Sequence, residues 1–424
     1  MKRLTAWFAR TVIDFDQRWL LALASGIAAS NIIANTLVVT RLLSPDGYLL
    51  PSTTRLIYAY NLGSVLLATA LSVTAWKCRE FRLPLKPVHF LLAALVLEAF
   101  VRINLFTDWT EIRWLKNPRL YATGRCGDES YHVLAHYYTG DLPPRLPVDR
   151  RVGWTAGGGP LRIIGSQFSD PSEVRPRPIL FFGDSFVAFG EELEHKIPQM
   201  LDHDFPQHDV LNFGVPGYAA DQISLRFQYE YPRFAKKEPV VLVGMLLDDL
   251  DRSLLEYRKA QKPFYELSGK DLVLHEPRYS TNEEYVDRYS FHHKSFLLSL
   301  LTTRGAELLS SETWCSSERV ELNRAIFRDM IDFARSRDVD IYLVVFYNHS
   351  DLKRRSPMER ELKAILGELE LDNVIDTKPI LLRHIEGNGG KLVDLYGGSG
   401  HHTETANRIV ADGIGSYLRQ SALR

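Results

Sequence analysis

The chain has few cysteines and almost no net charge. Only three of its 424 residues are cysteine, and the formal net charge is −1. So few cysteines exclude a disulfide-dense scaffold, and the balanced charge gives no indication of a nucleic-acid partner. Cys126 and Cys315 could form one disulfide in an oxidising compartment. The alternative is that they and Cys78 are free thiols.

The sequence also lacks the signatures of metal and nucleotide sites. The pairs His292-His293 and His401-His402 are not accompanied by cysteines or carboxylates at ligand spacing, so they do not indicate a metal ion. The run from Gly157 to Pro160 has neither the lysine nor the spacing of a phosphate loop and indicates a flexible turn. We therefore predict no metal ion and no cofactor.

Long apolar runs are confined to the first hundred residues. Trp19 to Thr40 and Leu56 to Trp76 carry no charge, and each is long enough to cross a hydrocarbon core of about 30 Å. A third run, Pro87 to Phe106, contains Glu98 and Arg102, whose i, i+4 spacing allows them to pair on one helix face. We predict that residues 1–106 form a membrane anchor with two or three transmembrane helices, and that a lipid bilayer is a partner.

Basic residues flank these runs unevenly. They are concentrated before the first run and between the second and third: Lys2, Arg3, Arg10, Arg18, Lys77, Arg79, Arg82 and Lys86. The positive-inside rule then places the N-terminus in the cytoplasm. Three spans would put the rest of the chain in the periplasm or outside the cell, whereas two would leave it in the cytoplasm. We predict a multi-pass membrane protein whose large domain is periplasmic or extracellular.

For the rest of the chain we predict a linker over residues 107–172 and an α/β domain over residues 173–424, with an insertion at about 251–316. Short apolar runs alternate there with amphipathic segments, which indicates a doubly wound, mostly parallel sheet. The expected strands are Ile179–Phe182, Val210–Leu211, Val240–Leu247, Ile341–Phe346 and Val374–Ile375, and helices are expected over Glu318–Arg337 and Pro357–Leu369.

The first of these strands ends in Gly183-Asp184-Ser185. A buried strand that feeds a tight turn can present a serine oxygen at the carboxyl edge of a sheet, where α/β proteins bind ligands. Ser185 is therefore a candidate nucleophile. The alternative is an ordinary strand-to-helix turn with Asp184 or Ser185 as N-cap.

Later segments supply further groups. The loop Asn212 to Tyr218 contains glycines that let backbone N–H groups approach a substrate oxygen, although glycine and proline also make ordinary turns. The third strand ends in the acidic run Asp248 to Asp251, and the chain closes with His401 to Ile414. In the insertion, Arg252, Arg258, Phe264 and Tyr265 could line a substrate cleft or belong to a solvated surface excursion.

In these segments the chain resembles the SGNH, or GDSL-type, hydrolase family over about residues 173–420. Ser185 matches the nucleophile of that family, Gly217 its oxyanion glycine and His401 its base, with a short polar turn and a helix following the histidine. The resemblance implies a flavodoxin-like three-layer fold and an acyl-ester substrate. It also implies that the backbone N–H groups of Ser185 and Gly217 bind the oxyanion.

Two positions depart from the family pattern. Asp248 stands where the family offers an asparagine to the oxyanion, so it can donate a hydrogen bond only if burial keeps it protonated. The family acid lies two or three residues before the histidine, where this chain has Gly398 and Ser399. Asp394 is the nearest carboxylate upstream and the candidate acid, provided that the intervening glycine loop folds back. A Ser-His dyad is the alternative.

These features predict a membrane-anchored serine esterase that hydrolyses small acyl esters, with carbohydrate of the cell envelope as one possible substrate. An O-acyltransferase acting on an envelope glycan is a second hypothesis, suggested by three spans where one would anchor a hydrolase. A binding domain without catalysis is a third, suggested by Asp248 and the missing acid.

Overall fold

The computed structural model describes residues 12–33, 51–77, 80–106, 148–154, 171–288, 295–300, 316–353, 356–388 and 390–423, and the single positions 115, 120, 121, 129, 132 and 133. The chain divides into two compact units, residues 1–123 with 283–308 and residues 124–282 with 309–424. Residues 283–308, which the sequence analysis assigned to the insertion, thus cluster with the N-terminal helices. The three cysteines, the run 157–159 and His292-His293 lie outside the described residues.

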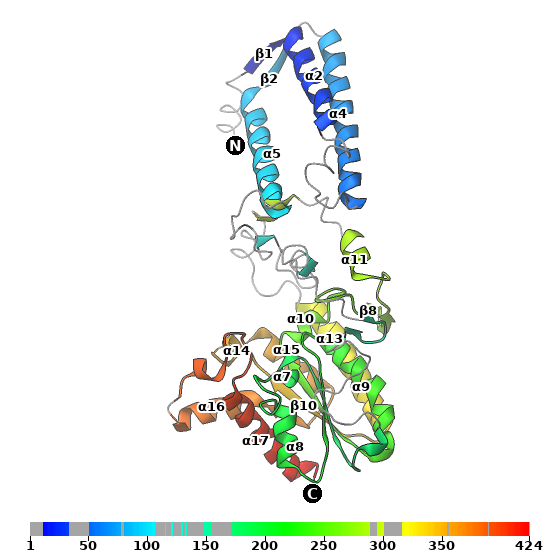
Figure 1. Cartoon of the computed structure of the whole chain (residues 1–424), viewed down its shortest axis with the longest axis vertical. Helices are drawn as coiled ribbons and strands as arrows, with labels where there is room; N and C mark the ends of the chain where they lie inside the picture. The colour runs from blue at the N-terminus through cyan, green and yellow to red at the C-terminus, as the bar shows by residue number, and fades with distance from the viewer. Residues whose placement is uncertain are drawn as a thin grey trace. The chain divides into compact units, whose positions relative to one another are not determined.

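Three helices make up most of the first unit (Figure 1). They are α2 (Gln17–Ile33), α4 (Pro51–Lys77) and α5 (Leu85–Phe106), and they fall on the three apolar runs of the sequence. An antiparallel strand pair, β1 (Val12–Asp16) with β2 (Glu80–Pro84), joins the segments that precede α2 and α5. The sequence analysis missed this pairing, because it links segments that are far apart in the chain.

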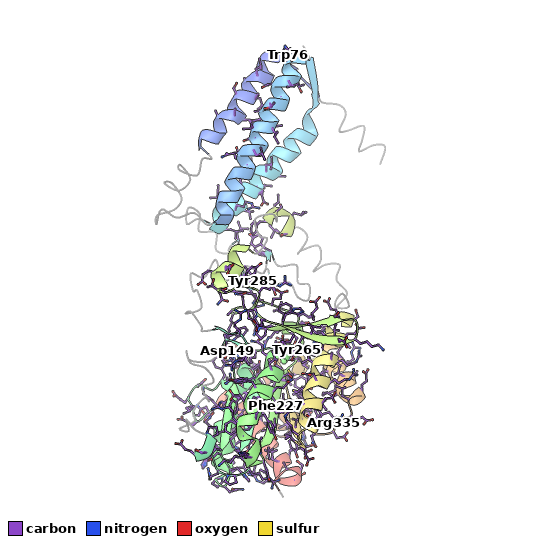
Figure 2. The ribbon with its side chains drawn as sticks, turned by 90° about the vertical axis from the view of Figure 1, so that its right-hand side faces the viewer. Trp76, Asp149, Phe227, Tyr265, Tyr285 and Arg335 are labelled. Carbon is purple, nitrogen blue, oxygen red and sulfur yellow. The ribbon has the colours of Figure 1, made fainter. Side chains whose placement is uncertain are left out.

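Many large apolar side chains of these helices are exposed. Leu62, Leu66 and Val96 leave 64%, 61% and 60% of their surface uncovered, and Trp76 leaves 81% (Figure 2). Within the described ranges, no helix combines the length and the apolar character that crossing a membrane requires. The predicted transmembrane helices are therefore not confirmed.

One carboxylate ties the later segment of this unit to α5. Glu98 pairs with Arg102, whose Nε lies 2.6 Å from Glu98 Oε1, as the i, i+4 spacing predicts. The same carboxylate accepts hydrogen bonds from the Oγ of Ser295 and the backbone N–H groups of Phe296 and Leu297, at 2.8, 3.0 and 2.7 Å. Glu98 therefore satisfies the first N–H groups of the short helical segment that begins at Phe296.

The second unit is built on a five-stranded parallel sheet. Its strands, which fall on the predicted apolar runs, are β5 (Ile179–Gly183), β6 (Val210–Gly214), β7 (Val240–Leu246), β10 (Ile341–Phe346) and β11 (Val374–Asp376). The order across the sheet is β11-β10-β7-β5-β6, the 2-1-3-4-5 order of flavodoxin-like proteins, with the topological switch point between β5 and β7. The prediction of an α/β domain on a parallel sheet is confirmed.

Helices cover both faces of this sheet (Figure 1). In one layer, α17 (Glu404–Ser421) packs against α8 (Ile197–Asp204) and α16 (Thr377–Asn388). In the other, α13 (Ser316–Arg335) packs against α9 (Ala220–Phe234) and α15 (Pro357–Glu368). Phe227 of α9 packs edge-on against Phe182 and Phe333, with ring centroids 5.5 and 5.2 Å apart. The helices are α7 (Ser185–Ala188), α8 (Ile197–Asp204), α9 (Ala220–Phe234), α13 (Ser316–Arg335), α14 (His349–Lys353), α15 (Pro357–Glu368), α16 (Thr377–Asn388) and α17 (Glu404–Ser421).

Short elements complete the unit. A buried ion pair between Lys262 and Asp221 fixes the start of the insertion to α9, since the two side chains are 1% and 0% exposed. The elements are β3 (Val148–Asp149), β4 (Gly153–Trp154), α10 (Asp249–Arg252), the hairpin of β8 (Phe264–Ser268) and β9 (Asp271–His275), α11 (Asn282–Arg288), which runs into the first unit, and the 3-10 helices η3 (Pro171–Glu173), η4 (Ala235–Lys237) and η6 (Leu392–Leu395).

Candidate active site

Ser185 is the first residue of α7, directly beyond the carboxyl end of β5. Asp184 is the N-cap, and its side chain accepts the backbone N–H of Phe186 at 2.8 Å. The turn needs Gly183, because a Cβ there would collide with the side chain of Val187 and lie 3.0 Å from the carbonyl oxygen of Gly244. Ser185 is only 7% exposed, and its hydroxyl donates to Asp184 Oδ2 at 3.3 Å.

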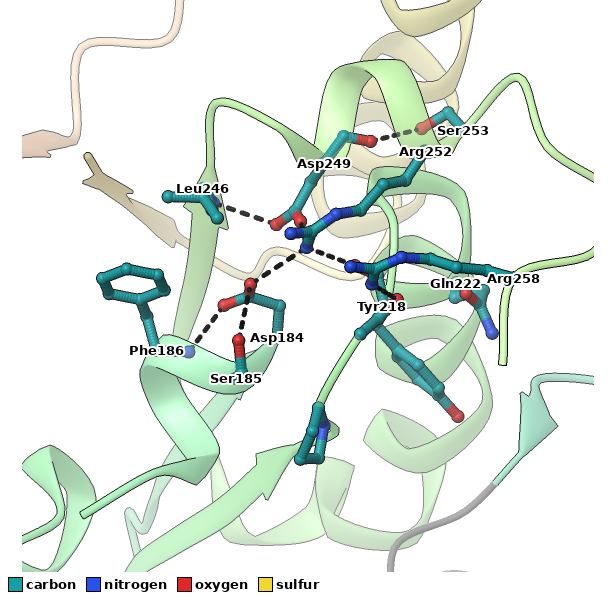
Figure 3. Close-up of polar contacts among 12 residues, drawn as sticks. Asp184, Ser185, Phe186, Tyr218, Gln222, Leu246, Asp249, Arg252, Ser253 and Arg258 are labelled. Atoms are coloured by element: carbon teal, nitrogen blue, oxygen red, sulfur yellow. Dashed lines mark hydrogen bonds and ion pairs between the residues drawn. The ribbon is translucent and has the colours of Figure 1, made fainter. Parts of the chain in front are cut away.

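A buried ion-pair network surrounds Asp184 (Figure 3). Arg252 Nη1 lies 3.2 Å from Asp184 Oδ2 and donates a second hydrogen bond to Asp249 Oδ1. Both carboxylates are 0% exposed, so without a cation they would be very costly to bury. Burial and the charge of Asp184 raise the pKa of Asp249 well above its usual range. The Arg252 guanidinium therefore holds two carboxylates beside the candidate nucleophile.

The sequence analysis noticed Asp249 and Arg252 but did not pair them. Their i, i+3 spacing directly after a buried strand was the available signal. The partner of Arg252 that follows β5, Asp184, could not be found in this way, because only the parallel pairing of β5 with β7 brings the two strand ends together.

Gly217 lies in the loop that follows β6. Its φ of +91° falls in the left-handed region, which glycine adopts without strain. The loop is held against the end of β5 by a 2.9 Å hydrogen bond from the Val215 N–H to the Gly183 carbonyl. Arg258 donates to the Gly217 carbonyl, and Trp154 Nε1 donates to the Pro216 carbonyl at 3.1 Å. Among the described residues, the N–H of Gly217 has no hydrogen-bond acceptor, so it is free for a substrate oxygen.

Asp248 follows the carboxyl end of β7 and lies close enough to Asp184 for their charges to interact. It is half-buried and directly precedes α10. Burial raises the pKa of Asp248, while the charges of Arg252 and Arg258 act in the opposite direction. The net effect favours the protonated form, which is the form that could donate a hydrogen bond to an oxyanion.

His401 is carried by a tight turn between η6 and α17. The Gly397 N–H donates to the His401 carbonyl at 2.8 Å, and Gly400 has a φ of +81°. The imidazole stacks on Phe189, with centroids 4.5 Å apart, and lies 5.5 Å from the ring of Phe186. Because Phe186 lies within α7 and Phe189 is the C-cap residue of that helix, the imidazole lies beside the helix that begins with Ser185.

The Nδ1 atom of His401 lies 3.2 Å from the Oγ of Ser399. Burial lowers the pKa of His401, and Arg252 and Lys259 lower it further, while Asp184 raises it. The imidazole is therefore neutral near pH 7, as a general base must be. The described contacts contain no hydrogen bond between His401 and Ser185.

Asp394 lies in η6. Its carboxylate accepts the backbone N–H of Lys391 at 3.2 Å, and its carbonyl accepts the hydroxyl of Thr403 at 3.2 Å. The glycine loop does fold back, but Ser399 rather than Asp394 meets the imidazole of His401. The structure does not bring Asp394 into contact with His401, because the carboxylate caps its own 3-10 helix.

His402 is a site residue that the sequence analysis did not separate from its neighbour. It is 8% exposed and packs against Phe186, Tyr396 and Phe346, at centroid distances of 4.9, 5.2 and 6.1 Å. Burial lowers the pKa of His402 to about 3.

Within the part of the chain that the structure describes, no three His, Cys, Asp or Glu side chains are arranged to hold a metal ion.

No protein-family profile matches the chain, and no curated protein sequence matches it. Several solved structures match at low similarity, among them the following three. A protein assigned to the lipolytic G-D-S-L family from Desulfitobacterium hafniense is 12% identical over 57% of this chain and 99% of that chain, with a TM-score of 0.31. A member of the same family from Veillonella parvula is 13% identical over 58% and 99%, with a TM-score of 0.32. A two-domain esterase active on acetylated mannans is 10% identical over 60% and 52%, with a TM-score of 0.33. These similarities are too low to assign the chain to a family.

Proposed function

We propose that this chain is a serine esterase of the SGNH type that hydrolyses small acyl esters. The observation that carries the proposal is the place of Ser185. Its hydroxyl lies at the carboxyl end of β5, next to the switch point of the sheet, and the neutral imidazole of His401 lies over the same helix. The proposed nucleophile, the proposed base and a loop with a free N–H would thus serve the edge where doubly wound sheets bind ligands.

In the proposed reaction the Ser185 oxygen attacks the ester carbonyl carbon, and Nε2 of His401 takes the hydroxyl proton. Nε2 is the nitrogen for this role because Nδ1 faces Ser399. The protonated imidazole then gives its proton to the leaving alcohol, which leaves the acyl group on Ser185. Water, activated by His401, attacks this acyl-enzyme and releases the acid. The Ser185 hydroxyl must first rotate away from Asp184, to which it now donates.

The negative charge on the carbonyl oxygen would be stabilised by the N–H groups of Ser185 and Gly217. Asp248 would add a third donor in its protonated form, which its raised pKa supports. Removing one such donor typically costs on the order of a hundredfold to a thousandfold in rate. Asp394, the candidate acid, has no contact that supports a role in orienting His401, so we propose Ser399 for that role.

The test is covalent labelling of the full chain with a fluorophosphonate probe, followed by peptide mapping and an assay of short acyl esters. We expect label on Ser185 and hydrolysis by the wild type, and neither in Ser185→Ala. Hydrolysis that survives Ser185→Ala would overturn the proposal. Adding a sugar acceptor and analysing the products separates hydrolysis, which gives free acid, from transfer, which gives acylated sugar.

A binding domain without catalysis is the second candidate. It is favoured by the hydrogen bond of Ser185 to Asp184 instead of His401. In that case the probe leaves Ser185 unlabelled while the protein is still folded. The two candidates therefore differ in one measurement.

We also propose that the N-terminal helices anchor the chain in a membrane, with the second unit in the periplasm or outside the cell and envelope carbohydrate esters within reach. The exposed leucine, valine and tryptophan side chains of α4 and α5 support this, since water would disfavour such a surface. Extraction of cell membranes with alkaline carbonate tests it. Release of the protein into the supernatant would contradict an anchor.

A further inference from the structure

Two cationic side chains from the insertion lie against Gly217. A Cβ placed on Gly217 would be 2.8 Å from Nη1 of Arg258 and 3.1 Å from Cε of Lys259. Arg258 also donates to the Gly217 carbonyl, so its guanidinium is fixed at the loop that would bind the oxyanion. Figure 3 shows the guanidinium of Arg258 directed toward Arg252, at the site that contains Asp184 and Ser185.

The three cationic side chains at this site, Arg252, Arg258 and Lys259, differ in their hydrogen-bond partners. Arg252 is paired with the buried carboxylates of Asp184 and Asp249. Arg258 makes its one side-chain hydrogen bond within the described residues to a carbonyl oxygen. The Lys259 ammonium, which is partly buried although the residue as a whole is exposed, has no acceptor there. Within the described residues, the site therefore holds two cations that donate no hydrogen bond to a carboxylate.

Burial of these cations has a cost that an anion would relieve. Burial lowers the pKa of Arg258 to about 10, and the charge of Arg252 adds to the effect, while the charges of Asp249, Asp184 and Asp248 oppose it. Burial and the charges of Arg258 and Arg252 also lower the pKa of Lys259. A carboxylate that accepts hydrogen bonds from both side chains would offset this repulsion, and such charge-assisted bonds are about twice as strong as neutral ones.

We propose that Arg258 and Lys259 bind a carboxylate carried by the ester substrate, close to the bond that reacts. The proposal rests on the proposed function for the identity of the ligand, and it narrows the substrate class to acyl esters that carry a negative charge. The carboxylate has two possible places, the acyl part and the alcohol part of the ester, and both offer the same chemistry to the two side chains.

Two matched pairs of small esters test the proposal. For the acyl part, monomethyl succinate is compared with methyl succinamate; for the alcohol part, acetoxyacetate is compared with acetoxyacetamide. The two members of each pair differ only in one group, which is a carboxylate in the first and an amide of the same shape in the second. The affinity of each ester is measured by titrating it into full-chain Ser185→Ala, because this variant separates binding from turnover. The kcat/KM of each ester is measured on the wild type.

We expect the carboxylate of at least one pair to bind about tenfold more tightly than its amide, in line with a charge-assisted hydrogen bond. The preference should shrink as salt is raised, because ions screen exposed charges. The ratio of carboxylate to amide affinity should fall to about one in the double variant Arg258→Gln with Lys259→Gln. It should fall to an intermediate value in Lys259→Gln alone. Lys236→Gln is the matched control, since Lys236 is exposed in η4 at the amino end of β7, and it should leave the preference unchanged.

Equal affinity for carboxylate and amide in both pairs would overturn the inference, as would a preference that survives the double substitution. If the wild type hydrolyses none of the four esters while the preference is present and depends on Lys259, the anion site stands and the proposed esterase activity fails. If all four are hydrolysed equally and bound equally, the activity stands and the anion site fails.

Discussion

The two segments that meet at the candidate site are held in different ways. The β5–α7 junction is buried and cross-linked by charge, with Asp184 paired to Arg252 and Ser185 almost covered. The turn from Tyr396 to Thr403 is a glycine-rich excursion whose His401 side chain has one hydrogen bond, to Ser399. The two segments therefore have different roles. The junction carries the proposed nucleophile within an ion-pair network that contributes to stability, whereas the turn supplies the proposed base, whose side chain has few fixed contacts.

The largest effect is expected at the turn. His401→Ala removes the proposed base and should lower kcat/KM for short acyl esters by about a hundredfold to ten-thousandfold, the range typical of general-base catalysis. The free energy of unfolding should change little, because the imidazole is half-buried and carries one hydrogen bond. Steady-state kinetics and a urea titration on the same sample check both parts. If His401→Ala were unfolded, or if it kept full activity, the proposed difference in role between the turn and the junction would be wrong.

The junction should respond in the opposite way. Arg252→Leu leaves Asp184 and Asp249 buried without their cation and should lower the free energy of unfolding by about 3–5 kcal/mol. Denaturant unfolding measures this. The control is Arg324→Leu, which breaks the more exposed pair with Glu368 and should cost no more than about 1 kcal/mol. Equal losses in the two variants would mean that the network contributes no more than a surface pair.

A pH effect distinguishes the two adjacent histidines. The pKa of His402 is lowered to about 3 by burial, so the unfolded chain takes up a proton below pH 6.5 that the folded chain does not. Stability is thus full above pH 6.5 and is lost on acidification toward pH 3, by up to about 1.4 kcal/mol per pH unit. His402→Phe should flatten this dependence, which denaturant titrations from pH 7 to pH 4 measure. An unchanged slope would show that the ring of His402 is accessible to water.

The smallest effect is expected at Ser399. Ser399→Ala removes one neutral hydrogen bond to Nδ1 of His401, and about 0.5–1.5 kcal/mol corresponds to a loss of roughly twofold to tenfold in kcat/KM. Asp394→Asn is the matched comparison and should have no larger effect. If Asp394 were the orienting acid after all, that variant would lose on the order of ten-thousandfold. The pair of variants thus decides which residue orients the base.

Local patterns were sufficient for the elements and for the residues at their ends. The apolar runs predicted every strand of the five-stranded sheet, and the amphipathic periods predicted α13 and α15, because burial and periodicity depend on residues that are adjacent in the chain. The resemblance added Ser185 and His401 as partners. Asp394 was chosen as the nearest carboxylate upstream of His401, and its side chain instead caps its own 3-10 helix.

The sequence by itself therefore determined where the strands lie and that a serine follows the first of them, since both depend on neighbouring residues. Only the tertiary structure decided that Arg252 holds Asp184 and that Arg258 and Lys259 lie over Gly217. These contacts depend on the parallel register of β5 and β7 and on the path of the insertion. No spacing within a single segment encodes such contacts, because they arise only when distant segments pack against one core.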